Sequence, residues 1–150
     1  VGTKLVTCDD QPSMDIVYKM GAIIDDSGNW RSTLKRSDQS GKTTTPGIQQ
    51  VRRFMSGDVI VEDILYDELL QIGEAHPPKG DSFRDLLVPV FRQGRNVYDA
   101  PSLDQSREKA RTLLSSFNQP KQHAIRCVLE ARLQAKKNQL LTTGDTYDSA

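Results

Sequence analysis

The chain has 150 residues, the length of one ordinary domain, and its 20 lysine and arginine residues balance 20 aspartate and glutamate residues. A chain without net charge has no overall field to attract nucleic acid or an anionic membrane surface, so we expect neither as a partner. Its apolar runs are short and interrupted, far below the roughly 20 residues needed to cross a bilayer. We therefore expect a soluble chain that is long enough to bury a core of its own.

The chain start and the cysteines indicate the cellular compartment. The first residues lack an initiator methionine and any export signal, so we expect an internal segment of a cytoplasmic protein. Cys8 and Cys127 lie far apart, without the spacing of a zinc site, which favours reduced thiols over a disulfide or a metal site.

The first part of the chain is predicted to form a β-hairpin. Residues Asp15 to Ile24 are rich in β-branched and aromatic side chains, and they end at the turn-forming run Asp25 to Asn29. A return strand is predicted from Trp30 to Leu34, and the polar residues Arg36 to Gly41 predict a loop.

A second pair of strands is predicted after Pro46-Gly47, which suits the middle of a type II turn. Proline presets φ at the first central position of such a turn, and glycine accepts a positive φ at the second. Strands are predicted from Ile48 to Met55 and from Val59 to Leu65, joined by a tight turn at Ser56 to Asp58.

The third part alternates between breaks and apolar runs. Residues Gly73 to Asp81 contain prolines and glycines, which predict a break in regular structure. The apolar run from Leu86 to Phe91 predicts a strand that Pro89 places at a sheet edge, and Gln93-Gly94 predicts a turn.

Two helices are predicted near the end. Ser102 and Gln105 have the spacing of a capping box, in which each side chain accepts a hydrogen bond from the other residue's backbone. An apolar stripe on this helix is expected to pack against the strands, and it consists of Ala110, Leu113, Leu114 and Phe117. A second amphipathic stretch from Ile125 to Leu140 predicts another helix, with Lys136 and Lys137 near its end.

No self-contained catalytic motif is present in the sequence. His76 and His123 have no partners at a defined spacing, so we assign neither of them a role. The acidic pairs Asp9-Asp10 and Asp25-Asp26 lack the spacing of a calcium loop and are interpreted as turn residues.

Two features could bind phosphate, although each has a simpler interpretation. One is a basic cluster, which we interpret as a solvated face and which consists of Arg31, Lys35, Arg36, Lys42, Arg52 and Arg53. The other is Gly2-Thr3, because a glycine at the opening of a turn lets backbone donors approach a phosphate and a threonine hydroxyl adds a donor. Taken alone, this pair is interpreted as a simple turn.

Several short segments share the order and spacing of motifs in one enzyme family. They are Val1 to Thr7, Val17 to Met20, Lys42 to Gly47 followed by Val51 to Arg53, Leu86 to Phe91 with Gly94, and Pro101 to Leu103 with Arg107 and Ala110. Together they resemble the C-terminal third of nicotinate phosphoribosyltransferases, over residues 1 to about 141.

This resemblance implies an enzyme of NAD salvage. Such an enzyme forms nicotinate mononucleotide and pyrophosphate from nicotinate and phosphoribosyl pyrophosphate, with ATP hydrolysis and Mg²⁺. It is expected to be a cytoplasmic homodimer. The segment itself is expected to bind no cofactor and to be inactive when isolated.

The implied fold class is α+β, the β-rich C-terminal part of a type II phosphoribosyltransferase with terminal helices, preceded by the last loop of an α/β barrel. In this arrangement residues 1–12 end the barrel and residues 13–100 form the β-rich region. Residues 101–141 form the helical region and residues 142–150 a flexible tail.

Gly2 and Thr3 match the end of the family's Gly-x-Gly-Thr loop, which cradles the ribose 5-phosphate of phosphoribosyl pyrophosphate. The first glycine of that loop would lie upstream, and no catalytic residue or metal ligand is carried over. Gln49 and Arg126-Cys127 depart from the family pattern. The alternative hypothesis is a small non-catalytic binding or interaction module derived from the family.

Overall fold

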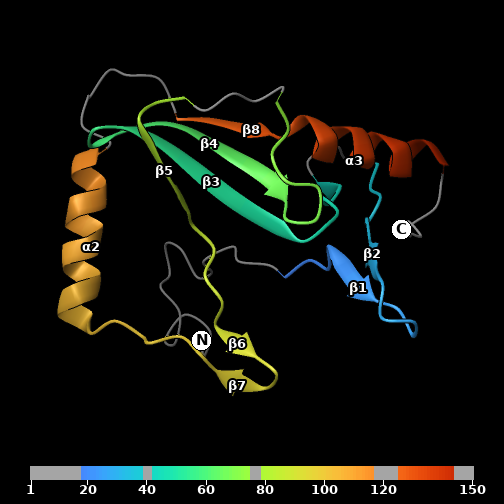
Figure 1. Cartoon of the computed structure of the whole chain (residues 1–150), viewed down its shortest axis with the longest axis horizontal. Coiled ribbons are helices and arrows are strands. Elements are labelled where there is room, and N and C mark those ends of the chain that lie inside the picture. The colour runs from blue at the N-terminus through green and yellow to red at the C-terminus, as the bar shows by residue number, and fades with distance from the viewer. Residues whose placement is uncertain (1–17, 39–41, 75–78, 117–124, 144–150) are drawn as a thin grey trace, which may run out of the picture.

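The computed structural model describes residues 18–38, 42–74, 79–116 and 125–143 as a mixed α+β arrangement (Figure 1). In chain order its elements are β1 (Ala22–Ile24), β2 (Trp30–Ser32), β3 (Gln49–Ser56), β4 (Val59–Asp67), β5 (Ser82–Asp85), β6 (Phe91–Arg92), β7 (Arg95–Asn96), α2 (Leu103–Ser116), β8 (Arg126–Leu129) and α3 (Ala131–Thr143).

A sheet with the strand order β5-β3-β4-β8 is the centre of the fold. β3 and β4 form an antiparallel hairpin in which Arg52 is opposite Ile64. β5 pairs antiparallel with the free edge of β3, and β8 pairs parallel with β4 on the other side. The apolar core gathers around β4 and α3, since Ile64, Tyr66, Leu133 and Leu140 are all buried.

The predicted hairpins are confirmed. β1 and β2 pair antiparallel, and the carboxylate of Asp25 closes their turn by accepting hydrogen bonds from the backbone N–H groups of Ser27 and Asn29, each at 2.9 Å. Residues 15–17 of the predicted first strand lie outside the described residues, and from residue 18 onward regular pairing begins only at Ala22. β3 and β4 match their predicted bounds closely, and Gly47 has the positive φ of 93° that its predicted turn position requires.

The prediction of a strand from Leu86 to Phe91 was wrong. The strand precedes this run, as β5, and β6 begins only at Phe91. The side chain of Gln50 explains the difference, because it occupies the backbone groups of Leu87: its Oε1 accepts the Leu87 N–H at 2.9 Å and its Nε2 donates to the Leu87 carbonyl at 3.0 Å. Gln93 and Gly94 form the predicted turn, between β6 and β7, with φ of 51° and 75°.

The capping box of α2 is confirmed. The Ser102 N–H donates to Gln105 Oε1 at 2.8 Å, and the Gln105 N–H donates to Ser102 Oγ at 3.2 Å. The apolar stripe packs less closely than expected, since α2 buries no residue and Leu114 is 68% exposed, although Leu113 is half-buried and lines a hollow with Met55 and Arg84. Phe117 lies outside the described residues. Figure 1 shows α2 standing at one end of the sheet and α3 near the other.

The second helix begins later than predicted, because Arg126 to Leu129 forms the strand β8. The buried carboxylate of Glu130 starts α3 by accepting the N–H groups of Arg132 at 2.7 Å and Leu133 at 3.1 Å. Lys136 and Lys137 lie in the middle of α3, whose last turn has no basic residue. Among the described residues, no helix has the length and apolar character that a bilayer crossing requires.

Candidate functional site

The predicted phosphate-binding pair, Gly2 and Thr3, lies outside the described residues, as do His76 and His123. The role of Gly2 and Thr3 therefore stays a prediction. Within the described ranges, no group of three or more histidine, cysteine, aspartate or glutamate side chains could hold a metal ion. Cys127 is an exposed, free thiol on β8.

The arginines of the central sheet are half-exposed, as their interpretation as part of a solvated face expects, and they are paired with carboxylates. Arg52 forms a bidentate pair with Asp85, with N–O distances of 2.8 and 2.9 Å. Arg53 forms another with Asp63, at 2.8 and 2.7 Å. Arg31 lies 3.3 Å from the carboxylate of Asp25 on the hairpin formed by β1 and β2. Their charges are already matched within the fold.

The pair of Arg52 and Asp85 belongs to a small network with two aromatic rings. The Arg52 guanidinium lies 4.3 Å from the ring centroid of Phe83 and 5.3 Å from that of Tyr66. Its hydrogen bonds to Asp85 hold the pKa of that carboxyl below its ordinary value, whereas burial raises the pKa of the Tyr66 phenol. Both shifts favour an ionised Asp85 and a neutral Tyr66 at neutral pH, as expected of a structural network.

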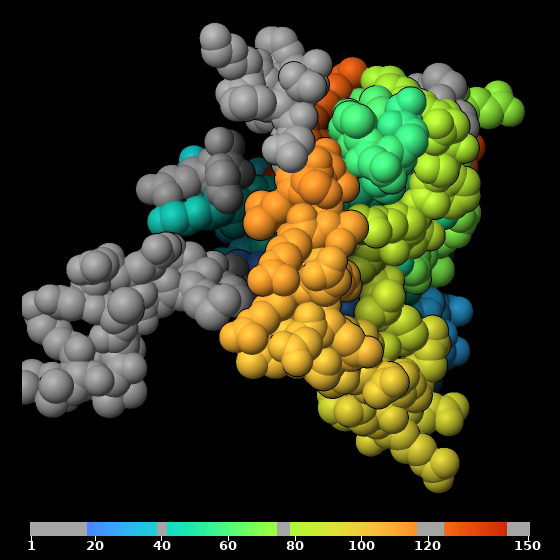
Figure 2. Space-filling model, turned by 90° about the vertical axis from the view of Figure 1, so that its left-hand side faces the viewer, coloured from blue at the N-terminus to red at the C-terminus, as the bar shows by residue number. Residues whose placement is uncertain are grey.

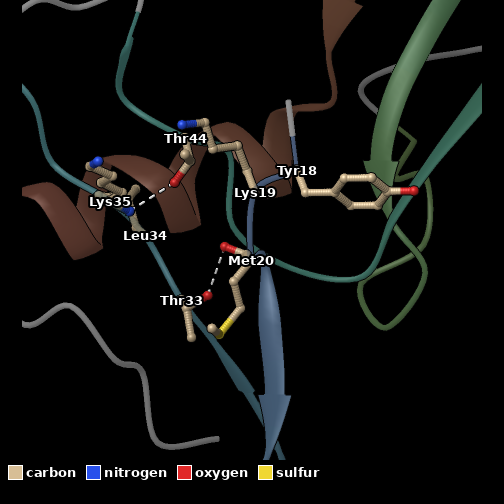
Figure 3. Close-up of a pocket in the computed structure, with 7 residues that line it drawn as sticks. All are labelled: Tyr18, Lys19, Met20, Thr33, Leu34, Lys35 and Thr44. Carbon is tan, nitrogen blue, oxygen red and sulfur yellow. Dashed lines mark hydrogen bonds between the residues drawn. The ribbon is translucent and has the colours of Figure 1, made fainter. Parts of the chain in front are cut away.

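Another group of basic residues lies where residues 18–20, 33–37 and 42–45 meet (Figure 3). Two adjoining cavities of about 450 and 560 Å³ share Lys19, Lys35 and Thr44 in their walls. Lys42 lines the second cavity. We call the region formed by Lys19, Lys35, Lys42 and the neighbouring threonines the lysine pocket.

Hydrogen bonds hold the three segments of the lysine pocket together. The Thr33 N–H donates to the Gly21 carbonyl at 2.9 Å, and the Thr33 hydroxyl donates to the Met20 carbonyl at 3.0 Å. The Thr44 hydroxyl accepts the Lys35 N–H at 2.8 Å, and the Thr44 N–H donates to the Lys35 carbonyl at 3.1 Å. The lysines therefore extend from a backbone framework that is fixed by internal bonds.

The charge of the lysine pocket is unbalanced. Among the described residues, neither cavity has an acidic side chain in its wall, and none of the three lysines takes part in an ion pair. Figure 3 shows the side chains of Lys19 and Lys35 extending on either side of Thr44, whereas the Tyr18 ring points away from them. Positive charge is therefore concentrated locally in a chain whose net charge is zero.

Sequence reasoning found only part of this group. Lys35 and Lys42 belonged to the predicted basic cluster, but Lys19 did not, because its approach to them depends on long-range hydrogen bonds. Its place in the motif Val17 to Met20 was the one available signal. Arg36, another member of the cluster, is exposed and does not line either cavity.

Comparison with known proteins identifies relatives of one kind. No protein-family model matches the chain. The nicotinate phosphoribosyltransferase of Bacillus subtilis is 44% identical over 134 residues, which cover 77% of this chain and 26% of that protein. The rat enzyme of the same name is 32% identical over 77% of this chain and 23% of that protein. The Mycobacterium tuberculosis nicotinate phosphoribosyltransferase pncB2 is 38% identical, over 78% of this chain and 22% of that protein. The chain thus spans about a quarter of the length of these curated relatives.

Proposed function

The chain belongs to the nicotinate phosphoribosyltransferases, as a segment of such an enzyme, and we propose that the whole protein joins nicotinate to phosphoribosyl pyrophosphate in NAD biosynthesis. The products are nicotinate mononucleotide and pyrophosphate, and ATP hydrolysis with Mg²⁺ drives the reaction. The observation that carries the proposal is the 44% identity to the Bacillus subtilis enzyme over 77% of this chain.

In this proposal the segment comes from the C-terminal part of the enzyme. Residues 1–12 close the last loop of an α/β barrel, and the β-rich and helical regions follow it. Gly2 and Thr3 provide donors to the 5-phosphate of phosphoribosyl pyrophosphate, while the catalytic groups lie in other parts of the polypeptide. The whole enzyme acts as a homodimer in the cytoplasm.

The exposed apolar side chains support a segment that packs against more polypeptide. Soluble proteins rarely leave large apolar patches uncovered. From β5 to the start of α2, however, many large apolar side chains are at least one-third exposed: Phe83, Leu87, Val88, Val90, Phe91, Val97 and Tyr98. Figure 2 shows α2, which also buries no residue, lying uncovered on one face of the described chain. We propose that the remainder of the enzyme covers this region.

The activity proposal is tested on the whole enzyme and on the isolated chain together. The whole protein should form nicotinate mononucleotide from nicotinate and phosphoribosyl pyrophosphate, and nicotinamide in place of nicotinate is the substrate control. The isolated 150-residue chain should give no product above a buffer blank. A folded whole protein without turnover would contradict the proposed reaction, and turnover by the isolated chain would contradict the placement of the catalytic groups.

The phosphate-loop assignment is tested with Gly2→Val in the whole enzyme. A branched side chain would hold the phosphate away from the backbone donors, and each charge-assisted hydrogen bond that is lost costs about 1.5–3 kcal/mol. The KM for phosphoribosyl pyrophosphate should rise roughly tenfold or more, with a much smaller change for nicotinate. Circular dichroism checks that the variant folds, and unchanged kinetics for both substrates would remove Gly2 from the site.

A further inference from the structure

We propose that α3 positions the walls of the lysine pocket through a series of buried contacts, so that a displacement of this helix alters the pocket. The series starts at Lys136, whose Nζ lies 3.6 Å from Oδ2 of Asp67. Asp67 is fully buried at the end of β4, and Figure 1 shows α3 near that end of the strand. Among the described residues Oδ2 has no hydrogen-bond partner, so Lys136 is the group that offsets its charge there.

The second contact lies between Asp67 and the turn before β3. The backbone of Gly47 packs so closely against the carboxylate that a Cβ atom at this position would overlap it. The other carboxylate oxygen, Oδ1, accepts the Ile48 N–H at 3.2 Å. A buried carboxylate that loses its cation gains free energy by moving toward water. Because Asp67 is packed against Gly47 and bonded to Ile48, such a movement disturbs the turn.

The third contact joins this turn to the lysine pocket. The Gly47 N–H donates to the Gly21 carbonyl at 2.7 Å, and the same carbonyl accepts the Thr33 N–H at 2.9 Å. The two glycine backbones are closely packed, since a Cβ atom at Gly21 would lie 2.7 Å from the Gly47 carbonyl oxygen. Thr33 is buried and lines the pocket, and its hydroxyl donates to the Met20 carbonyl at 3.0 Å. A displacement of the turn is therefore transmitted to the pocket walls, because closely packed groups transmit strain.

A double-mutant cycle on the 150-residue chain tests this coupling. Lys136→Met removes the cation, and Thr33→Val removes the hydroxyl that bonds to Met20 while keeping the shape of the side chain. Urea denaturation gives the unfolding equilibrium constant of each variant. For sites without a connection, the two effects multiply to within about twofold. We expect the double variant to fall below the product by about fivefold or more, because either change already loosens the contacts on which the other depends.

Lys137→Met is the matched control. Lys137 is the next residue of α3, it is also half-buried, and within the described part of the chain it takes part in no ion pair. Its effect should combine with that of Thr33→Val without coupling. If Lys136→Met does not fold, Lys136→Gln and Lys137→Gln replace the two methionine variants, because glutamine keeps a hydrogen-bond donor near Oδ2 and costs less stability.

Amide exchange separates positioning of the pocket from general stabilisation of the fold. Arg53→Met, which breaks the largely buried ion pair with Asp63 in the central sheet, is the comparison. Urea concentrations are chosen so that this variant and Lys136→Met have the same global stability. The amides of Gly47 and Thr33 should then exchange about tenfold faster in Lys136→Met, since only this variant releases the turn by local opening.

Either of two results would overturn the inference. One is a coupling to Thr33→Val no larger than that of the Lys137 control. The other is equal exchange at Gly47 and Thr33 in the two variants of matched stability, which would show that Lys136 only stabilises the fold. Neither measurement involves a transferase reaction, so the outcome is independent of the proposed activity.

Discussion

The backbone of Gly47 packs directly against the carboxylate of Asp67, so closely that a Cβ atom at Gly47 would overlap that carboxylate. Asp67 is fully buried, and its Oδ1 accepts the N–H groups of Ile48 at 3.2 Å and Leu69 at 3.0 Å. The Gly47 N–H donates to the carbonyl of Gly21 at 2.7 Å. This contact joins the turn before β3 to the end of β4 and to the segment that carries the lysine pocket.

Gly47→Ala should therefore destabilise the chain more than an ordinary glycine replacement does. A non-glycine residue at the φ of 93° loses about 1–3 kcal/mol of folding free energy, and the overlap of the added Cβ with Asp67 costs about 1–3 kcal/mol more. Gly28→Ala is the matched control, because Gly28 has a φ of 84° but nothing within 4 Å of an added Cβ. Urea denaturation measures both, and equal losses would show that Asp67 does not restrict the position.

The second oxygen of Asp67 depends on Lys136. Oδ2 has no hydrogen-bond partner among the described residues, and the Lys136 Nζ lies 3.6 Å away. Lys136→Met should leave a buried carboxylate without its cation and reduce the free energy of unfolding by roughly 3–5 kcal/mol. The double variant with Asp67→Asn should recover part of that loss. If the effects of the two single changes simply add, the two groups are not coupled.

The two helix caps should differ in their effect on stability. Glu130 is buried, and it accepts hydrogen bonds from Arg132, Leu133 and Gly73, so Glu130→Ala should cost about 2 kcal/mol or more in urea denaturation. Ser102→Ala removes a cap of similar chemistry from α2, which buries no residue. We expect faster amide exchange in α2 with little change in global unfolding. A large global loss for Ser102→Ala would show that α2 folds cooperatively with the sheet.

The pair of Arg52 and Asp85 predicts a specific pH dependence. Since the pKa of Asp85 in the folded chain is below its ordinary 3.8, its contribution to stability is present above that value and is lost as the pH falls through the folded pKa. Asp85→Asn should lower stability at pH 7 by no more than about 1 kcal/mol, because the pair is partly exposed. The difference in stability between Asp85→Asn and the unmodified chain should shrink as the pH falls below 3.8 and vanish once it has passed the lower pKa of the folded chain.

Chemical denaturation at a series of pH values measures this gap. Asp104→Asn is the control, since the Asp104 side chain is 92% exposed in its pair with Arg107. We expect the control to show almost no gap at any pH. A gap for Asp85→Asn that stays constant down to acid pH would exclude ionisation of this carboxyl as its source.

Local turn and cap chemistry could be read from the sequence, because each signal involves residues only a few positions apart. The hairpin around Asp25 and the capping box of Ser102 are examples. The strand β5 was not predicted because its sequence is polar and has no apolar alternation. It is fixed instead by pairing with β3, in which Arg52 binds the side chain of Asp85. The run from Leu86 to Phe91 misled the prediction since its apolar side chains do not enter the core of this segment.

The candidate site was harder to predict than the fold. Lys19, Lys35 and Lys42 are separated along the chain, and the hydrogen bonds of Thr33 and Thr44 bring their segments together. No spacing rule connects them. The predicted basic cluster also contained four arginines. Three of them, Arg31, Arg52 and Arg53, form ion pairs with carboxylates. These ion pairs depend on the pairing of β1 with β2 and of β3 with its neighbouring strands, which the sequence does not show.

A chimera tests most directly whether this chain serves as a segment of a nicotinate phosphoribosyltransferase. The matched residues of the Bacillus subtilis enzyme, 44% identical to this chain, are replaced by those of this chain, and formation of nicotinate mononucleotide from nicotinate and phosphoribosyl pyrophosphate is measured. A folded chimera should turn over well above a Bacillus subtilis enzyme from which the segment has been deleted. A chimera that folds and binds its substrates but forms no nicotinate mononucleotide would contradict the assignment.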